Sequence, residues 1–252
     1  MCVLKIDLKK IFSILVILNF VLIANAQSGK SAEDIKLYYR SSLTYGLAFH
    51  TEGWGGSFKY YQHLSYKIKR FYTFEYQNLK HPKQEKVTNA FDDNAKGFFF
   101  GKINSFTHAR FGVGSQRSFA LKELKKGVQV SWIYSAGFNL GFLKPIYLEV
   151  YDLDNAGQRV QERYDPAVHT IGVIYGRGSY FKGFSEMEFV PGLYGKFGLN
   201  FEYSPYDERI KSMEVGVAMD WFYKEVPLMY NTYNNQYWVT FYVMFELGKK
   251  LE

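Results

Sequence analysis

Three residues of types used in nucleophilic catalysis lie close together in the first third of the chain. His63 and Ser65 are two positions apart, so in a β-strand they would share one face, and Glu75 falls in the next predicted strand. A serine nucleophile, a histidine base and an orienting carboxylate could form a hydrolase or acyltransferase site. No nucleophile-elbow motif accompanies them. We therefore predict no catalytic residues and keep a lipid-modifying enzyme as the alternative.

The segment DLDNAG, residues 152–157, resembles the start of a calcium-binding loop. An EF-hand loop would also need Asp or Asn at its fifth position and Glu at its twelfth, where this chain has Ala156 and Arg163. A solvated turn is the better interpretation. We accordingly predict no metal site, and nothing in the sequence indicates a cofactor.

The first 26 residues have the three parts of a secretory signal peptide. Basic residues precede an apolar core at 11–23, and Ala24, Asn25 and Ala26 form an A-x-A cleavage site. Cys2 is the single cysteine of the chain and lies in this segment. The mature protein would therefore lack disulfides and a thiol nucleophile, and it would have no cysteine for lipid attachment. Residues 27–41 are predicted to be a periplasmic lead.

Removal of the signal takes away three lysines and one aspartate, which leaves 28 basic and 23 acidic residues and a net charge of +5. This excess is small and scattered, so we expect no nucleic-acid partner. Aromatic residues make up 19% of the chain, about twice the usual share. No apolar run after the signal approaches the 18 or so residues of a spanning helix.

Residues 128–142 show the pattern that explains these aromatics. Trp132, Tyr134, Phe138 and their even-numbered neighbours alternate with small or polar residues, as in a strand with one apolar and one polar face. Similar segments predict eight strands at 42–50, 57–67, 72–77, 98–114 (with a bulge near 103–105), 128–142, 192–204, 213–223 and 236–248. The expected fold is all-β: a closed antiparallel transmembrane β-barrel of about eight strands, formed by residues 42–252 in the outer membrane.

The connections support an alternating arrangement. The two longest, 79–97 and 144–187, follow the third and fifth strands and would both be extracellular, whereas 67–70 and 204–208 are short. Within the longer loop, 146–151 and 170–175 could form strands above the membrane. The glycines of TEGWGG, residues 51–56, predict a turn, and 224–235 reads as a polar, Asn-rich loop.

A soluble, lipocalin-like barrel is the structural alternative, because it also alternates. The apolar faces here consist of Phe, Tyr, Leu, Val and Trp, which are too bulky for eight strands to enclose. We therefore place them toward lipid. The opposite faces carry charges of both signs, which we expect to form structural ion pairs inside the barrel. These residues are Lys59, Glu75, Arg110, Lys196, Glu202, Glu214, Asp220 and Glu246.

Basic residues in the predicted outer loops could contact lipopolysaccharide phosphates, although scattered surface charge explains them equally well. They are Lys80, Lys83, Lys86, Arg159, Arg163, Arg177 and Lys182.

Five segments resemble a family of small, largely uncharacterised outer-membrane barrel proteins of Gram-negative bacteria. They are GKINSF (101–106), ARFGVGSQR (109–117), GFLKPIYLEVY (141–151), PGLYGKFGLNFEYS (191–204) and EVGVAMDWF (214–222). The resemblance covers most of the chain from about Gly97 and implies a barrel in the outer membrane, with no assigned catalytic residues. The chain departs from the usual barrel ending, because Lys249, Lys250, Leu251 and Glu252 stand where a terminal aromatic is common.

These observations lead us to expect a non-catalytic barrel that acts through its surfaces. The leading hypothesis is an accessory or structural subunit of an envelope complex for barrel assembly, secretion or uptake. An adhesin that uses its long loops is a further alternative. The expected partners are outer-membrane lipid, lipopolysaccharide and proteins of an outer-membrane complex.

The cleavage site is directly testable. Mature protein isolated from membranes is expected to begin at Gln27, as measured by intact mass. Replacement of Ala26 by a bulky residue such as Trp should leave the precursor uncleaved, because the peptidase accepts only small side chains there. A mature chain that retains residues 1–26 would contradict the prediction.

Overall fold

The computed structural model describes residues 40–65, 67–89, 95–120, 128–152, 158–203 and 209–251. The predicted signal peptide, nearly all of the predicted lead and the turn at 204–208 lie outside these ranges. The described residues form thirteen β-strands and contain no helix. No helix in this part of the chain has the length and apolar character needed to cross a membrane.

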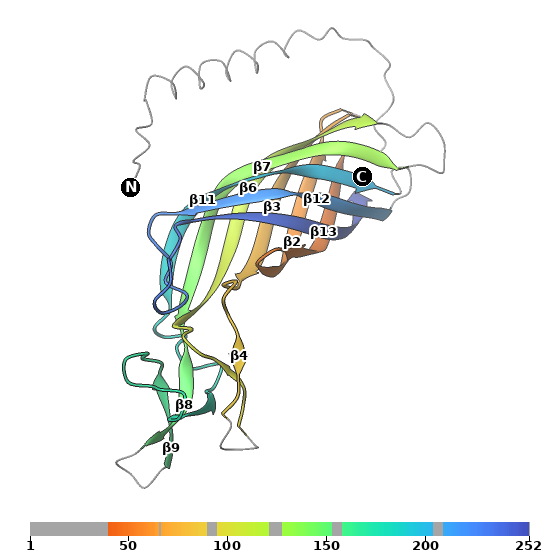
Figure 1. Ribbon diagram of the computed structural model, residues 1–252. Coiled ribbons are helices and arrows are strands. Elements are labelled where there is room, and N and C mark those ends of the chain that lie inside the picture. Colours follow the sequence, from red (N-terminus) through yellow and green to blue (C-terminus); the bar gives the residue numbers. More distant parts are fainter. Residues whose placement is uncertain are drawn as a thin grey trace, which may run out of the picture. The chain divides into compact units, whose positions relative to one another are not determined.

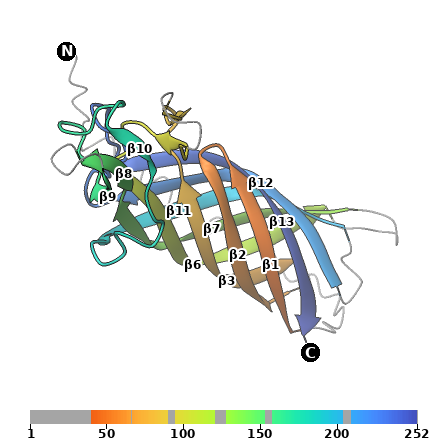
Figure 2. The same cartoon turned by 90° about the horizontal axis from the view of Figure 1, so that it is seen from below.

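Eight strands form a closed antiparallel barrel in the order β1-β13-β12-β11-β7-β6-β3-β2 (Figures 1 and 2). β1 and β13 close the barrel by pairing with each other. Their register begins with Ser41 opposite Leu251 and ends with His50 opposite Tyr242. The eight-strand prediction is confirmed. The barrel strands are β1 (Ser41–His50), β2 (Gly53–His63), β3 (Ile68–Leu79), β6 (Asn104–Ala120), β7 (Gln129–Pro145), β11 (Glu188–Glu202), β12 (Arg209–Phe222) and β13 (Tyr237–Leu251).

The two ends of the barrel differ. One end, the loop end, carries the β1–β2 turn and the long connections after β3, β7 and β12. The other, the terminus end, carries the start of β1 at Ser41 and the end of β13 at Leu251. Outer-membrane barrels have short periplasmic turns and longer extracellular loops, so the loop end faces outward.

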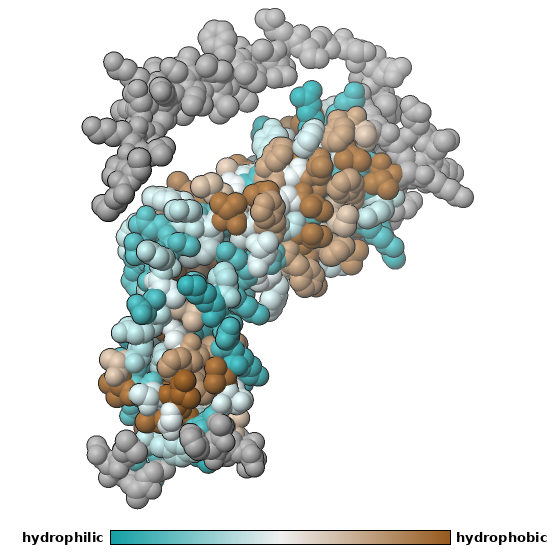
Figure 3. Space-filling view, viewed as in Figure 1, coloured by the Kyte–Doolittle hydropathy of each residue, from teal (hydrophilic) through white to brown (hydrophobic). Residues whose placement is uncertain are grey.

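The barrel wall has the reverse polarity of a soluble protein. On β7, Trp132 and Phe138 point outward with 42% and 58% of their surface exposed, whereas Ser131 and Asn139 are buried inside. Figure 3 shows hydrophobic residues covering the barrel wall toward the end that carries the C-terminus. An apolar exterior around a polar interior defines a transmembrane barrel of the outer-membrane type and rules out the lipocalin-like alternative.

The five remaining strands come from the long connections at the loop end. β4 (Lys86–Val87) pairs with β5 (Phe98–Phe99), and a second sheet has the order β10-β8-β9. Its strands are β8 (Tyr147–Asp152), β9 (Gln158–Arg163) and β10 (Ile174–Arg177). The strand expected at 146–151 is confirmed as β8. The strand expected at 170–175 was placed too early, because residues 171–173 form a turn and β10 begins at Ile174. β9 was not predicted, because QRVQER is an almost wholly exposed edge strand without an apolar period.

These strands and the residues around them, 80–103 and 146–187 where described, form what we call the outer lobe. It has its own core of Phe98, Leu148, Val150, Tyr164 and Ile174. The two connections are tied together, because the Asn89 side-chain amide donates to the Ile174 carbonyl at 2.8 Å. The long loops therefore build one folded unit.

The predicted fourth strand, 98–114, was placed too early. Gly101 has φ of 77°, which L side chains rarely adopt, and the chain turns there between β5 and β6. The barrel strand begins at Asn104. The bulge expected near 103–105 was wrong, because Asn104 and Ser105 pair regularly with β7 and the register shift lies between Ser118 and Ala120. Phe98 is 1% exposed in the outer-lobe core rather than facing lipid.

The predicted turn TEGWGG was also too long. Only Thr51 and Glu52 form the turn, and β2 starts at Gly53. A Cβ atom on Gly55 would lie 2.4 Å from the Gln77 side chain and from the Tyr76 carbonyl. The glycine thus marks a close approach between β2 and β3 rather than a reversal of the chain.

The lipid-facing wall is testable at Phe197, which lies mid-way along β11 and is 54% exposed. Phe197→Arg is expected to lower the free energy of unfolding by about 2–4 kcal/mol, because a charge would be placed in the hydrocarbon layer. Denaturant unfolding from lipid vesicles measures this effect. Phe197→Leu is the control and should remain close to wild type; equal stability of the two variants would show that this face does not contact lipid.

Candidate functional site

An apolar cap closes the lumen at the loop end. Phe106, Phe222 and Trp238 contact one another with ring centroids 5.2–5.8 Å apart. The cluster is completed by Leu79, Leu143, Val190, Val226, Leu228 and Met229. Since all are buried, the mouth of the barrel is filled by side chains.

Part of this cap comes from residues 223–236, between β12 and β13. The Leu228 carbonyl accepts from the Ile103 amide at 3.0 Å, and the Tyr230 amide donates to the Gly101 carbonyl at 2.8 Å. The predicted loop at 224–235 is present, but our prediction that it is polar was wrong for three of its residues. Val226, Leu228 and Met229 pack into the mouth, a role that the surrounding Asn and Tyr residues concealed.

Below the cap, charges of alternating sign cross the lumen. Lys196 donates to Glu75 at 2.6 Å and lies 3.1 Å from Glu214. The Lys59 ammonium lies between two carboxylates, 2.5 Å from Glu214 and 2.7 Å from Glu246. Tyr242 also donates to Glu214, at 2.7 Å. The network therefore links β2, β3, β11, β12 and β13.

Arg110 of β6 extends the network toward the cap. Its guanidinium binds Asp220 through two contacts, at 2.9 and 2.5 Å, and Glu75 at 3.1 Å. Asn139 of β7 donates to the same Asp220 carboxylate at 2.9 Å. A bidentate arginine is directional, so this pair fixes how β6 and β12 face each other across the lumen.

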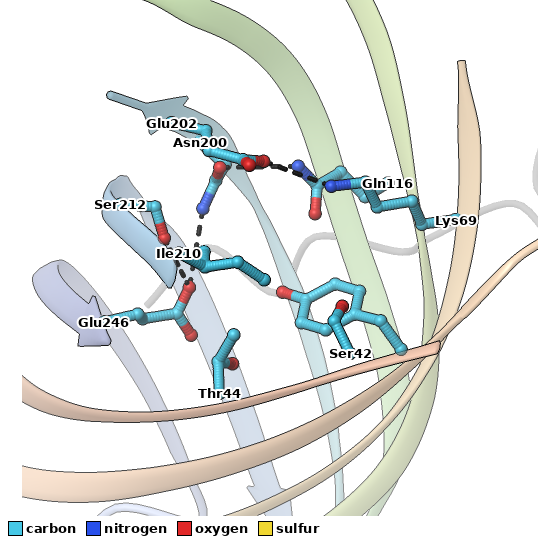
Figure 4. Close-up of a pocket in the computed structure, with 10 residues that line it drawn as sticks. Ser42, Thr44, Lys69, Gln116, Asn200, Glu202, Ile210, Ser212 and Glu246 are labelled. Carbon is cyan, nitrogen blue, oxygen red and sulfur yellow. Dashed lines mark hydrogen bonds and ion pairs between the residues drawn. The ribbon is translucent and has the colours of Figure 1, made fainter. Parts of the chain in front are cut away.

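Toward the terminus end the lumen contains a small cavity lined mainly by polar side chains (Figure 4). Its volume of about 10 Å³ is close to the size of one water molecule. Lys69 pairs with Glu202 at 3.1 Å beside it. Asn200 and Ser212 both donate to Glu246, at 3.4 and 3.3 Å. The cavity is too small for an organic substrate.

The structure brings all eight predicted interior charges into the lumen, each with 7% exposure or less. Lys69 and His108 are further members that the sequence did not reveal to us. Lys69 lies in the predicted β2–β3 turn region, and His108 is fully buried 3.7 Å from Asp220. His108 could have been identified from the sequence. It is two residues from Arg110 on β6, so the two side chains point to the same face of the strand.

The serine, histidine and glutamate candidates are not brought together. Glu75 pairs in register with Ser57, whereas His63 is opposite Lys69, so the two are separated by about 20 Å along the strands. The His63 ring instead lies 3.1 Å from the Ser42 hydroxyl. This arrangement does not form a catalytic triad.

No metal site is found among the residues that the structure describes. Of the calcium-like segment, Asp152 ends β8 and residues 153–157 lie outside the described ranges.

Two ionisable groups at the loop end, both outside the barrel strands, have shifted pKa values. Burial raises the pKa of Glu52 in the β1–β2 turn to about 7, and the Asp220 carboxylate adds to the rise. Burial lowers the pKa of Lys102 to about 8, and Lys80 and Lys144 lower it further by repulsion. Near pH 7 Glu52 is therefore partly protonated, whereas Lys102 keeps most of its charge.

Two basic residues of the outer loops are engaged by other side chains. Arg159 stacks on the Tyr175 ring, 3.6 Å from its centroid, and Arg163 pairs with Glu186 at 3.4 Å. Lys83 and Lys86 are exposed on the other connection. Contact of these cations with lipopolysaccharide stays a prediction.

The outer lobe instead presents an exposed aromatic group, which we call the aromatic knob: Tyr180, Phe181 and Phe184. Their exposed fractions are 67%, 80% and 45%. Tyr180 contacts the other two rings with centroids 5.9 and 5.8 Å away. The Lys144 ammonium fixes this segment from the end of β7, because it donates to the Tyr180 carbonyl at 2.6 Å and lies 4.2 Å from the Tyr180 ring centroid.

Comparison with known proteins gives likeness of fold only. No protein-family model matches the chain, and no curated protein sequence matches it. Similar solved structures include Ail, the attachment invasion locus protein of Yersinia pestis, in complex with the heparin analogue sucrose octasulfate (12% identity, TM-score 0.39). Others are Neisserial surface protein A (8%, 0.41) and the N-terminal β-barrel domain of Pseudomonas aeruginosa OprF (9%, 0.36).

Each match covers 84% of this chain, and 97%, 96% and 98% of the respective structures. The barrel that the predicted resemblance implies is shown by the strand order of this chain itself. At these identities and TM-scores, the likeness transfers no function to this chain.

The lumen network predicts a large difference between two lysines. Lys196→Met is expected to lower the free energy of unfolding by about 3–5 kcal/mol, because Glu75 and Glu214 each lose a buried partner. Lys224→Met removes an exposed pair with Glu188 and should cost less than about 1 kcal/mol. Denaturant unfolding in vesicles measures both; equal losses would contradict a stabilising role for the network.

Proposed function

We propose that this protein is a non-catalytic outer-membrane barrel that acts by binding, as an accessory or structural subunit of an envelope complex. The observation that supports this proposal is a filled lumen joined to a folded outer lobe. Eight strands leave no pore, and here the interior is occupied by an apolar cap and ion pairs. Transport through the lumen is therefore not the function we propose.

The contact surface in this proposal is the outer lobe with its aromatic knob. Large aromatic side chains dominate the energetics of protein interfaces, because they bury much area with little loss of rotamer freedom. Phe181 is 80% exposed although its segment is held in place by Lys144. An exposed apolar group on a fixed segment is typical of a binding surface.

Adhesion is the second candidate, since the same surface faces outward. The two functions differ in the location of the partner. An envelope subunit binds another protein of the same cell, whereas an adhesin binds a surface outside it.

The proposal predicts that the aromatic knob is needed for complex formation. Full-length protein carrying Tyr180→Ser, Phe181→Ser and Phe184→Ser is expected to lose a partner that copurifies with wild type after crosslinking in native outer membranes. Tyr233→Ser is the matched control, because Tyr233 is 95% exposed but lies on the β12–β13 connection.

The outcomes separate the candidates. Loss of the partner in the triple variant alone supports an envelope subunit. Unchanged copurification together with lost binding to foreign cells would favour an adhesin. Altered acylation of lipid A or phospholipid after deletion of the gene would instead support the enzyme alternative and overturn the non-catalytic proposal.

A further inference from the structure

A group of cations lies on the outer wall at the terminus end. Arg209 of β12 is directly opposite Lys249 of β13, and Lys211 lies two residues further along β12. All three are exposed and have the parity of the lipid-facing residues Val215 and Leu247. Within the ranges that the structure describes, none of the three has a carboxylate within ion-pair distance.

Among the described residues this arrangement is unfavourable. Like charges directly opposite in an antiparallel pair repel, and here they stand at the edge of a lipid-facing surface. The cations of the lumen differ from this group, because Lys59 and Lys196 each lie between two carboxylates. An anion from outside the chain would satisfy the exposed group.

Apolar residues adjoin the cations and form a groove with them. Leu43 of β1 is opposite Lys249, and Tyr45 is opposite Leu247. With Leu251 these residues line an open groove of about 590 Å³ on the outer wall. Figure 2 shows β1 and β13 side by side where they approach the C-terminus. Positive charge at the rim and apolar surface toward the barrel centre match the two ends of a phospholipid.

We propose that this groove binds an anionic phospholipid, with its phosphate between Arg209 and Lys249 and an acyl chain along Leu43, Tyr45 and Leu247. Lys211 supplies a third cation for a headgroup with a second negative charge. The terminus end faces the periplasm, so the ligand belongs to the inner leaflet of the outer membrane. The site is independent of the outer lobe and goes beyond the function proposed above.

A second basic pair at the same end gives an internal comparison. Arg70 of β3 is opposite Ser115, and Arg117 of β6 is opposite Ile68, so the two arginines are diagonal neighbours on the outer wall. Both are exposed, and neither lines the groove. General attraction between anionic lipid and basic residues would act on both pairs of cations. A specific binding site would act only at the pair that lines the groove.

Native mass spectrometry of the mature protein, released from mixed micelles with equal amounts of phosphatidylglycerol and phosphatidylcholine, tests this proposal. Wild type is expected to retain one phosphatidylglycerol. Arg209→Gln with Lys249→Gln should weaken retention by about tenfold or more, because two cations near the phosphate are lost. Arg70→Gln with Arg117→Gln removes the same charge at the same end and should leave retention unchanged.

Arg209→Lys keeps the charge and is expected to retain the lipid, which separates binding from folding. Shifted migration of unheated samples on gels confirms that each variant is folded. Equal loss in the two double variants, or equal retention of phosphatidylglycerol and phosphatidylcholine by wild type, would overturn the proposal. In a second set of micelles with equal amounts of phosphatidylglycerol and lipid A, preferential retention of lipid A would overturn the assignment to the inner leaflet.

Discussion

Charge neutralisation inside a closed barrel is the constraint on which this structure depends. In hydrocarbon the strands must close so that every backbone group is paired, and the outward side chains must be apolar. Polar and charged residues are then restricted to a narrow lumen, where an unpaired charge is costly. The alternating series Asp220, Arg110, Glu75, Lys196, Glu214, Lys59 and Glu246 meets this requirement with contacts from six of the eight strands.

The same network specifies the register of the barrel. A shift of one residue between two strands would exchange their inner and outer faces and expose these charges to lipid. The apolar cap closes the loop end with residues from β3, β6, β7, β11, β12 and β13 and from the connection before β13. Side chains thus fill the barrel from lumen to cap. The outer lobe is held on it by hydrogen bonds from the Lys144 ammonium to the Tyr180 carbonyl and from the Tyr230 amide to the Gly101 carbonyl.

This division of roles explains where binding is proposed. The charges that we predicted in the lumen are engaged in ion pairs, and the groups that we consider for binding lie outside it. The aromatic knob is an apolar group exposed on the outer lobe, and Arg209, Lys211 and Lys249 are cations exposed on the lipid-facing wall. Each is a feature that the protein alone leaves without a complementary surface.

The sequence by itself determined the barrel, because a period of two residues fixes which side chains face lipid. Residues 128–142 indicated it most clearly, and parity placed all eight predicted charges inside. The sequence did not determine which charges pair with each other. Lys196 and Glu75, for example, are 121 positions apart and meet only when the sheet closes into a barrel. Tertiary structure also decided the roles of the glycines at 53–56, of Phe98 and of Val226. Local pattern assigned these residues to a turn, a lipid-facing strand and a polar loop, whereas long-range packing placed them in β2, in the outer-lobe core and in the cap.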